Sequence, residues 1–394
     1  MIPQLRLDDP ESARGLEDVA QYLKKARRVV FITGAGVSCN AGIPDFRSED
    51  GLYNIVKRQY PEAVVKGKDL FDSILFRDPL TVQIFHTFMA GLRKSILDAH
   101  PTPTHHLIKR LREKKKLLRC YTQNIDGLEK QVGLSLGYTE PQSLEVVQLH
   151  GDIHLLKCPN CMIERDWTKE DEELLASGKA PICSECLHAE NARAACGKRS
   201  RPVGLLRPNI VLYGEEHPYG DIIGKCLARD IKSAPDLLIV AGTSLKVVGI
   251  RHLVKDLAKA VRNKGGKVLF VNRTPVSGSM WKGTIDYHLE CDTDAWVSDL
   301  KERIPLFFMN QSKIKVKQEK RLLDPQTPEK PPKKQTLANY YPVSPKIEPD
   351  LLDSSPQGFK VFQVNPQRAA PIDYDLMAKE ILLSPSPTFS LDIK

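Results

Sequence analysis

The chain has 394 residues, which is enough for two or three domains and a full hydrophobic core. Its formal net charge of +9 favours acidic partners such as nucleic acid or chromatin, although surface charge alone does not establish contact with either. The N-terminus lacks the apolar core of a signal peptide, and no apolar run reaches the roughly 18 residues that cross a bilayer. We therefore expect a soluble, intracellular protein with no membrane contact.

A glycine-rich loop follows the first expected strand, the apolar run from Val29 to Ile32. Gly34 and Gly36 have no Cβ, so we expect their amides and the N-terminus of the next helix to face a pyrophosphate. The standard dinucleotide fingerprint has a third glycine where this chain has Cys39. The loop predicts a nucleotide site that differs from a standard dehydrogenase site. A tight structural turn is the alternative interpretation.

Residues from about 16 to 305 alternate strand-like apolar runs with helix-like segments. This pattern predicts a Rossmann-like, doubly wound α/β domain with a parallel sheet. Further strands are expected at Leu117 to Tyr121, Leu237 to Ala241 and Val268 to Val271. We also expect a helical insertion at about 51–99 and a small metal-binding module at about 155–201. Because ligands bind at the carboxyl ends of parallel strands, the polar segments after these strands should converge.

Two Cys-x-x-Cys pairs lie in the second insertion and are separated by 21 residues. In a reducing compartment, this spacing predicts zinc rather than disulfides. The four expected ligands are Cys158, Cys161, Cys183 and Cys186. Four thiolates leave no open coordination position, so the metal is expected to be structural. Cys196 or His188 could instead replace one thiolate of the second pair.

Several polar segments follow expected strands. Gln123, Asn124 and Asp126 follow the second strand, and His150 with its following glycine ends another short apolar run. A histidine at such a position can act as a general base near neutral pH. The segments 242–244 (Gly-Thr-Ser) and 272–273 (Asn-Arg) supply donors that suit ribose and phosphate. Each of these features also has an ordinary explanation when taken singly. The polar segments are common turns, and His150 is one of ten histidines.

The composition changes at Ser312, because 12 of the chain's 28 prolines fall in the last 83 residues. This predicts a disordered tail over 312–394. The tail carries five Ser-Pro or Thr-Pro sites, at Thr327, Ser344, Ser355, Ser384 and Ser386. We expect a regulatory segment with kinase and ubiquitin-ligase contacts. The basic stretch from Lys330 to Lys334 is expected to assist nuclear import.

Taken in order, these segments resemble the sirtuins, which are NAD-dependent protein lysine deacylases, over roughly residues 16–305. Within that family the chain looks most like the fungal nuclear class I histone deacetylases. The resemblance implies NAD and zinc as cofactors and an acetylated histone, or another acetyl-lysine protein, as substrate. It also implies chromatin as a partner and the nucleus as the location.

The resemblance implies that His150 is the general base, and it makes Asn124 and Asp126 the other catalytic residues. The carboxylate of Asp126 would lie near the cationic ribose that forms as nicotinamide leaves. The implied products are nicotinamide, O-acetyl-ADP-ribose and free lysine. The implied cofactor-binding residues are Gly34, Ala35, Gly36, Ser38, Ile43, Asp45, Phe46, Arg47, Gln123, Asn124, Ile125, Asp126, Gly242, Thr243, Ser244, Asn272, Arg273 and Cys291.

The segment from Val211 to Glu215 matches the family segment that pairs with the substrate peptide, with Tyr213 where phenylalanine is usual. Sirtuins that prefer acidic acyl groups carry a Tyr-x-x-Arg pair in the helical insertion. No tyrosine lies between Asp69 and Leu97, so an uncharged acyl group is expected. A protein ADP-ribosyltransferase and a non-catalytic chromatin-binding module remain as alternatives, and the joint presence of Asn124, Asp126 and His150 argues against the second.

Overall fold

The computed structural model describes residues 2–49, 51–60, 67–138, 142–276 and 278–309. The predicted tail, 312–394, and its five candidate phosphorylation sites lie outside these described residues. Within the described ranges, no helix combines the length and the apolar character needed to cross a membrane.

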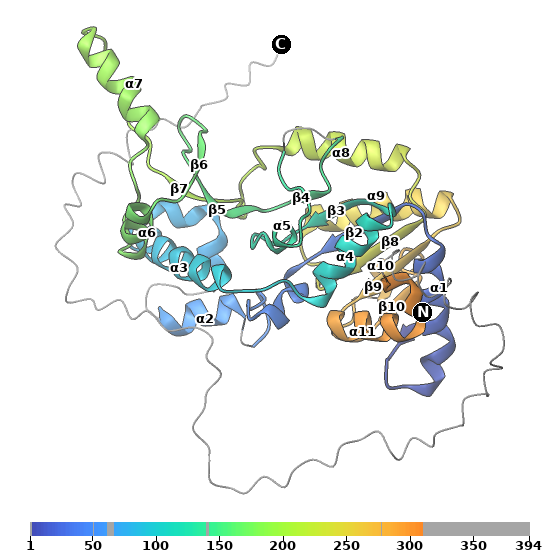
Figure 1. The fold of residues 1–394 in the computed structure, drawn as a ribbon. Coiled ribbons are helices and arrows are strands. Elements are labelled where there is room, and N and C mark those ends of the chain that lie inside the picture. The colour runs from blue at the N-terminus through green and yellow to red at the C-terminus, as the bar shows by residue number, and fades with distance from the viewer. Residues whose placement is uncertain (1, 50, 61–66, 139–141, 277, 310–394) are drawn as a thin grey trace, which may run out of the picture.

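A seven-stranded parallel sheet forms the larger part of the molecule (Figure 1), with the strand order β1-β10-β9-β8-β2-β3-β4. Its strands are β1 (Gln4–Leu5), β2 (Val29–Thr33), β3 (Leu117–Thr122), β4 (Val146–Gln148), β8 (Leu237–Ala241), β9 (Lys267–Val271) and β10 (Tyr287–Leu289). The four predicted strands are therefore confirmed as β2, β3, β8 and β9, and they lie next to one another. All five residues of β2 and of β8 are buried, which explains their continuous apolar sequence.

Helices cover both faces of this sheet, which confirms the predicted doubly wound fold. On one face, Phe31 of β2 packs in a core with α1 (Ala13–Lys25), α4 (Pro103–Glu113) and α11 (Thr293–Arg303). On the other face, Ile32 packs in a core with α8 (Gly220–Lys232), α9 (Val248–Asn263) and α10 (Gly278–Trp281). Successive residues of β2 thus serve opposite faces, as the strand period of two requires. The short helices α5 (Leu128–Gln131) and α12 (Pro305–Phe308) complete this part.

A buried ion pair joins the sheet to α8. Arg119 of β3 donates to both carboxylate oxygens of Asp230, over 2.7 and 3.1 Å, and the Tyr121 hydroxyl donates to the same carboxylate over 2.6 Å. The side chains of Arg119 and Asp230 are only 3% and 1% exposed. These bonds pair the two charges with each other and with the Tyr121 hydroxyl. Removal of either Arg119 or Asp230 would therefore leave the other charge buried without a counter-charge.

Residues 51–99 hold α2 (Leu52–Gln59), two 3₁₀ segments (Gly67–Phe71 and Ser73–Arg77) and α3 (Pro79–Leu97). The Asp78 carboxylate caps α3 by accepting from the Thr81 amide over 2.9 Å, and Pro79 occupies the first helical turn. Phe85, Phe88 and Met89 form a separate core here. That core includes Ile125 and Ile210, so the helical segment packs beside the carboxyl end of the main sheet.

A second, three-stranded antiparallel sheet has the order β6-β5-β7. It contains β5 (Gly151–Lys157), β6 (Glu164–Asp166) and β7 (Arg207–Ile210), together with α6 (Lys169–Ala176) and α7 (Ser184–Ala195). Helix α6 packs against α3, where the Arg93 guanidinium lies 4.8 Å from the centre of the Trp167 ring. Helix α7 projects away from the rest of the molecule and has no buried residue (Figure 1).

Candidate active site

The loop after β2 packs directly on the loop after β8. The Gly34 amide donates to the Ala241 carbonyl over 3.0 Å, and the Gly36 amide donates to the Gly242 carbonyl over 2.8 Å. A Cβ at Gly34 would lie 2.7 Å from the Gly242 oxygen, and one at Gly36 would lie 2.8 Å from the Gly242 Cα. We expected these glycines to leave room for a ligand beside the backbone. The neighbouring loop fills that space instead, so this explanation of the two glycines is wrong. Two 3₁₀ turns, Ala35–Val37 and Cys39–Ala41, stand where a helix was expected.

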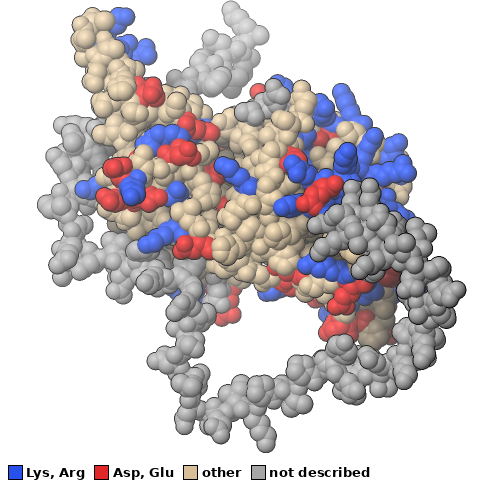
Figure 2. Space-filling model, in the orientation of Figure 1, with Lys and Arg blue, Asp and Glu red and all other residues tan. Residues whose placement is uncertain are grey.

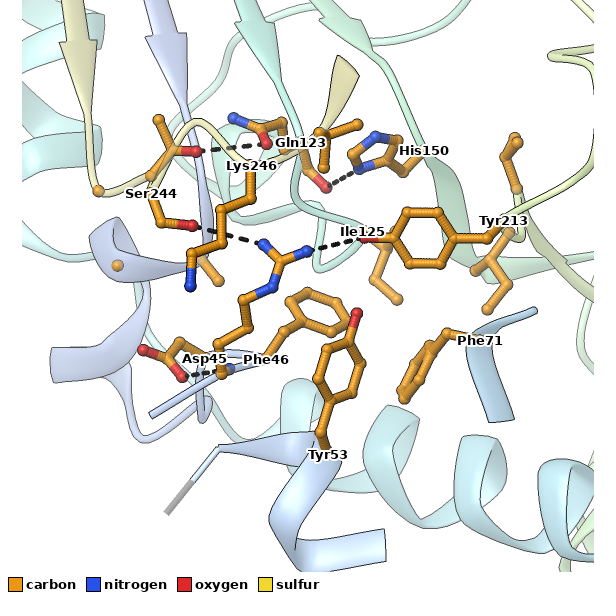
Figure 3. Close-up of a pocket in the computed structure, with 18 of the residues that line it drawn as sticks. Asp45, Phe46, Tyr53, Phe71, Gln123, Ile125, His150, Tyr213, Ser244 and Lys246 are labelled. Atoms are coloured by element: carbon orange, nitrogen blue, oxygen red, sulfur yellow. Dashed lines mark hydrogen bonds between the residues drawn. The ribbon is translucent and has the colours of Figure 1, made fainter. Parts of the chain in front are cut away.

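A pocket of about 500 Å³ opens at the carboxyl ends of the central strands (Figure 3). It lies between the main sheet, the helical segment and the end of β7. The polar segments therefore converge as predicted. The predicted site residues that line it are Ala35, Gly36, Asp45, Phe46, Arg47, Gln123, Ile125, His150, Gly242, Thr243, Ser244 and Asn272.

Three predicted residues form a buried group behind the pocket lining. The Ser38 hydroxyl donates to the Asp126 carboxylate over 2.7 Å, and the Asn124 amide donates to the Ser38 oxygen over 3.1 Å. The other Asp126 oxygen accepts from the Leu128 amide over 3.1 Å. Asp126 is 3% exposed, so its carboxylate is oriented by these bonds rather than by water.

The structure does not bring four other predicted cofactor residues to the pocket surface. Gly34 lies against Thr243, and Ile43 belongs to the core of the helical segment. Arg273 is exposed and pairs with Asp292 over 2.7 Å, and Cys291 packs against the core of the main sheet. Their cofactor roles stay predictions from the resemblance.

His150 has one ring nitrogen committed to the backbone. Its Nδ1 lies 3.0 Å from the Gln123 carbonyl oxygen, which can only accept, so Nδ1 carries the proton and Nε2 keeps its lone pair. Burial lowers the pKa of His150 below its usual 6.5, which keeps the ring neutral at neutral pH. The next residue, Gly151, has a φ of +89°, and a Cβ there would lie 2.2 Å from the Asn209 oxygen. Only glycine allows β5 to begin so close to β7.

Arg47 connects three segments across the pocket. Its guanidinium donates to the Ser244 hydroxyl over 3.4 Å and to the Tyr213 hydroxyl over 3.1 Å. In Figure 3, dashed lines that end at the labelled Ser244 and Tyr213 mark these two bonds. The predicted substrate segment, from Val211 to Glu215, lines the same pocket. The Tyr213 amide donates to the Phe71 carbonyl over 2.8 Å, which fixes this segment to the helical part.

Sequence reasoning missed several pocket residues. Tyr53, Phe71, Lys246, Val247 and Thr274 line the pocket but were not expected there. Lys246 and Val247 directly follow the Gly-Thr-Ser segment, so proximity in the chain could have indicated them. Phe71 belongs to an aromatic pattern that also predicts a core, and it packs edge-on against Phe46 with ring centres 5.3 Å apart.

A buried titratable cluster, not anticipated from the sequence, lies on the inner side of Asp126. One potential ligand or proton-binding atom from each of His105, Asp126 and Glu129 lies within 4.8 Å of the others. Glu129 has no exposed surface. Burial, followed by the charge of Asp126, raises the pKa of Glu129 from 4.5 to about 8. Glu129 therefore carries a proton at neutral pH, so Asp126 has no second negative charge from Glu129 beside it.

We expect Glu129→Gln to stabilise the fold, and more so at higher pH. The pKa of Glu129 is higher in the folded chain than in the unfolded chain. The contribution of Glu129 to the free energy of unfolding is therefore fully present below pH 4.5 and is lost as the pH rises towards 8. The gain should increase by on the order of 3 kcal/mol between pH 5 and pH 8. Urea unfolding at both pH values measures it, with exposed Glu173→Gln as the control. An equal gain at both pH values would mean that Glu129 is ionised in the folded protein.

The four predicted zinc ligands come together outside the pocket. Their sulfur atoms lie within 4.8 Å of one another, with Cys158 and Cys186 3.7 Å apart and Cys161 and Cys183 3.6 Å apart. Tetrahedral zinc with bonds of about 2.3 Å needs sulfurs about 3.8 Å apart, so the donor set fits zinc. Cys196 follows the far end of α7 and is not in the cluster, which favours Cys186 as the fourth ligand.

Gly204 allows the chain to pass close to these sulfurs. A Cβ there would lie 2.4 Å from the Cys158 sulfur and 3.3 Å from the Cys186 sulfur. We therefore expect Gly204→Ala to release zinc at a chelator concentration at least tenfold lower than the unchanged protein requires. A colorimetric chelator titration measures the release. Gly224→Ala is the matched control, because a Cβ there meets nothing within 4 Å. Equal zinc retention in the two variants would show that the cluster does not need this close approach.

Comparison with known proteins gives the same family throughout. The Sir2 family model matches residues 34–249. The NAD-dependent histone deacetylase HST3 of Candida albicans is 50% identical, and the match covers 76% of this chain and 64% of that protein. HST3 of Saccharomyces cerevisiae is 46% identical, with 76% and 70% covered. The chain thus spans slightly less than two thirds of the first relative's length and slightly more than two thirds of the second's.

A solved structure of Sir2Tm bound to a propionylated peptide superimposes on the same region. The sequence identity is 25% and the TM-score is 0.53, and the match covers 73% of this chain and 97% of that one. The family model matches more than half of the chain, and the chain also contains the converged pocket and the cysteine cluster. The chain therefore belongs to the Sir2 family.

Proposed function

We propose that the chain is an NAD-dependent protein lysine deacetylase that acts on histones. The observation that carries this proposal is the state of His150, whose protonated Nδ1 is held by Gln123 and whose Nε2 is free to accept a proton at the pocket. The two HST3 relatives bear the name NAD-dependent histone deacetylase, which supports the same activity here.

The residues around the pocket suit the separate tasks of the reaction. Bound NAD would supply the ribose that accepts the acyl group and the nicotinamide that leaves. The Asp126 carboxylate, fixed by Ser38 and Leu128, would stabilise positive charge that develops on the ribose. His150 would remove a proton from a ribose hydroxyl through Nε2. Arg47 presents a guanidinium to the pocket, where it suits a phosphate.

The substrate side of the pocket suits an uncharged acyl group. Phe46, Phe71, Ile210 and Leu212 contribute apolar side chains to the lining. We propose that acetyl-lysine enters along the segment from Val211 to Glu215, with its peptide backbone beside that segment. The cysteine cluster would hold zinc in a structural role, because it lies outside the pocket and all four ligand positions are filled by protein.

Incubation with NAD labelled in the adenine ring and a set of acetylated histone peptides tests this function. We expect nicotinamide release that depends on the peptide, and label on free acetyl-ADP-ribose. Label on protein instead would favour the ADP-ribosyltransferase alternative. Absence of both products in protein that retains zinc would contradict any catalytic function for the pocket.

We further propose that the protein acts in the nucleus on chromatin, and that residues 16–305 form the catalytic domain. A histone substrate supports the nuclear location, and cell fractionation tests it. A chain that ends near Gln311 should keep its peptide activity if the tail is only regulatory. The kinase and ubiquitin-ligase contacts of the tail rest on its Ser-Pro and Thr-Pro sites alone.

A further inference from the structure

Basic residues gather at the edge of the main sheet that lies opposite the pocket. Strands β2, β3, β8 and β9 are parallel, and they begin in register, with Val29 beside both Leu117 and Leu237, and Leu237 beside Lys267. The segments that precede these strands therefore lie together. We call their basic residues the amino-edge surface: Lys24, Lys25, Arg27, Arg28, Lys114, Lys115, Lys116, Lys232, Arg262, Lys264 and Lys267.

Hydrogen bonds between the segments show that this surface is continuous. The Lys116 ammonium donates to the Lys24 carbonyl over 3.0 Å, and the Asp236 amide donates to the Arg28 carbonyl over 3.0 Å. The Lys267 amide donates to the Asp236 carbonyl over 3.4 Å. Figure 2 shows Lys and Arg side chains crowded at the upper right, over the ends of α8 and α9.

The acidic groups at this edge are already engaged. Asp236 accepts from the backbone amides of Arg27 and Arg28 over 2.8 and 2.9 Å. Asp286 pairs with Arg262 over 3.3 Å and with Lys267 over 3.9 Å. Among the described residues, the side chains of nine of the eleven amino-edge residues form no ion pair; they are all of them except Arg262 and Lys267. The surface therefore keeps a large uncompensated positive charge.

The positive groups are close enough to affect one another. The pKa of Lys116 is lowered by burial and by the charges of Arg27 and Lys114, although Asp236 opposes the shift. The pKa of Lys114 is lowered by burial and by Arg110. Such crowding costs stability in the free protein and is relieved when a polyanion binds. This favours a ligand with closely spaced negative charges over a small anion.

We propose that the amino-edge surface binds the phosphate backbone of duplex DNA. This inference rests on the proposed function, because a histone substrate is presented on DNA. Duplex DNA carries one negative charge per roughly 1.7 Å, which matches a surface with several unpaired cations on four adjacent segments. Contacts to phosphate would give affinity without sequence preference.

The position of the surface leaves the pocket accessible. The pocket lies at the carboxyl ends of the strands and the amino-edge surface at their amino ends, so bound DNA would not cover the pocket. The five-residue strands β2 and β8 are about 17 Å long, and an extended histone tail of ten residues spans about 33 Å. A tail that leaves the same nucleosome can therefore reach the pocket around the side of the sheet.

The test compares two charge-reversal variants of the full chain by fluorescence anisotropy with a labelled 30-base-pair duplex. The first is Lys25→Glu, Lys115→Glu and Lys264→Glu, three exposed residues of the amino-edge surface. The control is Lys169→Glu, Lys179→Glu and Lys198→Glu, three exposed residues of the small module with the same change in net charge. Thermal melts check that both variants fold.

We expect the first variant to bind DNA at least tenfold more weakly, and the slope of log affinity against log salt to become shallower by about 3. The control should bind nearly as the unchanged protein does. Both variants should turn over a free acetylated peptide normally, while the first should be slower on nucleosomes. Failure on the free peptide would contradict the proposed function rather than this surface.

Three results would overturn the DNA assignment. Equal weakening in both variants would mean that only net charge matters. If the unchanged chain bound no duplex DNA near physiological salt, duplex DNA would be excluded as the ligand of this surface. Binding of single-stranded RNA at least tenfold tighter than duplex DNA, lost in the first variant, would assign the surface to RNA instead.

Discussion

Replacement of His150 by alanine is expected to lower the rate of the proposed deacetylation at least a hundredfold, because the Nε2 that we propose as the acceptor of the ribose hydroxyl proton is lost. The His150 side chain lines the pocket and its one hydrogen bond joins Nδ1 to the Gln123 carbonyl, so folding and NAD binding should remain. Peptide turnover and calorimetric titration with NAD measure the two effects. Exposed His252→Ala is the control. Full activity in the purified variant would remove His150 from the mechanism.

The pH profile of the unchanged enzyme gives a second measure of the same base. Burial lowers the pKa of His150, so the ring stays neutral over a wider range than an exposed histidine. The acidic limb of the pH profile should therefore have its midpoint below pH 6.5. A midpoint at or above pH 6.5 would contradict a base whose pKa is lowered by burial.

The second large effect is expected for Asp230→Ala. This change leaves the Arg119 guanidinium without its carboxylate in a site that is 3% exposed, and it also frees the Tyr121 hydroxyl. The free energy of unfolding should fall by about 3–5 kcal/mol, the usual cost of breaking a buried pair on one side. Urea unfolding in the presence of zinc measures it. That loss is a large fraction of the 5–15 kcal/mol that typically stabilises a domain.

Exposed Asp221→Ala, in the first turn of the same helix, is the control and should lower stability by less than about 1 kcal/mol, the usual contribution of a carboxylate at a helix N-terminus. The Asp230→Ala variant should still bind NAD at a low temperature at which it remains folded, because Asp230 does not line the pocket. A loss below about 1 kcal/mol for Asp230→Ala would show that water reaches the pair in the folded protein.

The central strands could be predicted from sequence because each is a continuous apolar run buried on both faces, as in β2 and β8. The outer strands β1, β4 and β10 have only two or three residues, too few for a periodic pattern. Their pairing depends on neighbours that are distant in the chain, such as Gln4 beside His288.

The candidate site was predictable where a motif follows a strand, as for Gln123 and Gly242. It was not predictable where tertiary packing decides the role of a residue. Tyr53 and Phe71 look like ordinary core residues, yet both line the pocket. Spacing could not separate Cys186 from Cys196, whereas the sulfur positions in the fold do. Nor does sequence reveal that Glu129 is enclosed beside Asp126.

His150 and the first zinc ligand stand at the two ends of one short strand. Gly151 begins β5 directly after His150, and Cys158 follows its last residue, Lys157. With zinc at the proposed site and His150 as the proposed general base, a shortage of the metal would disturb that base through the seven residues of β5, without any change in NAD supply. Metal availability would set the fraction of molecules competent for catalysis, and turnover per zinc-loaded molecule would stay constant.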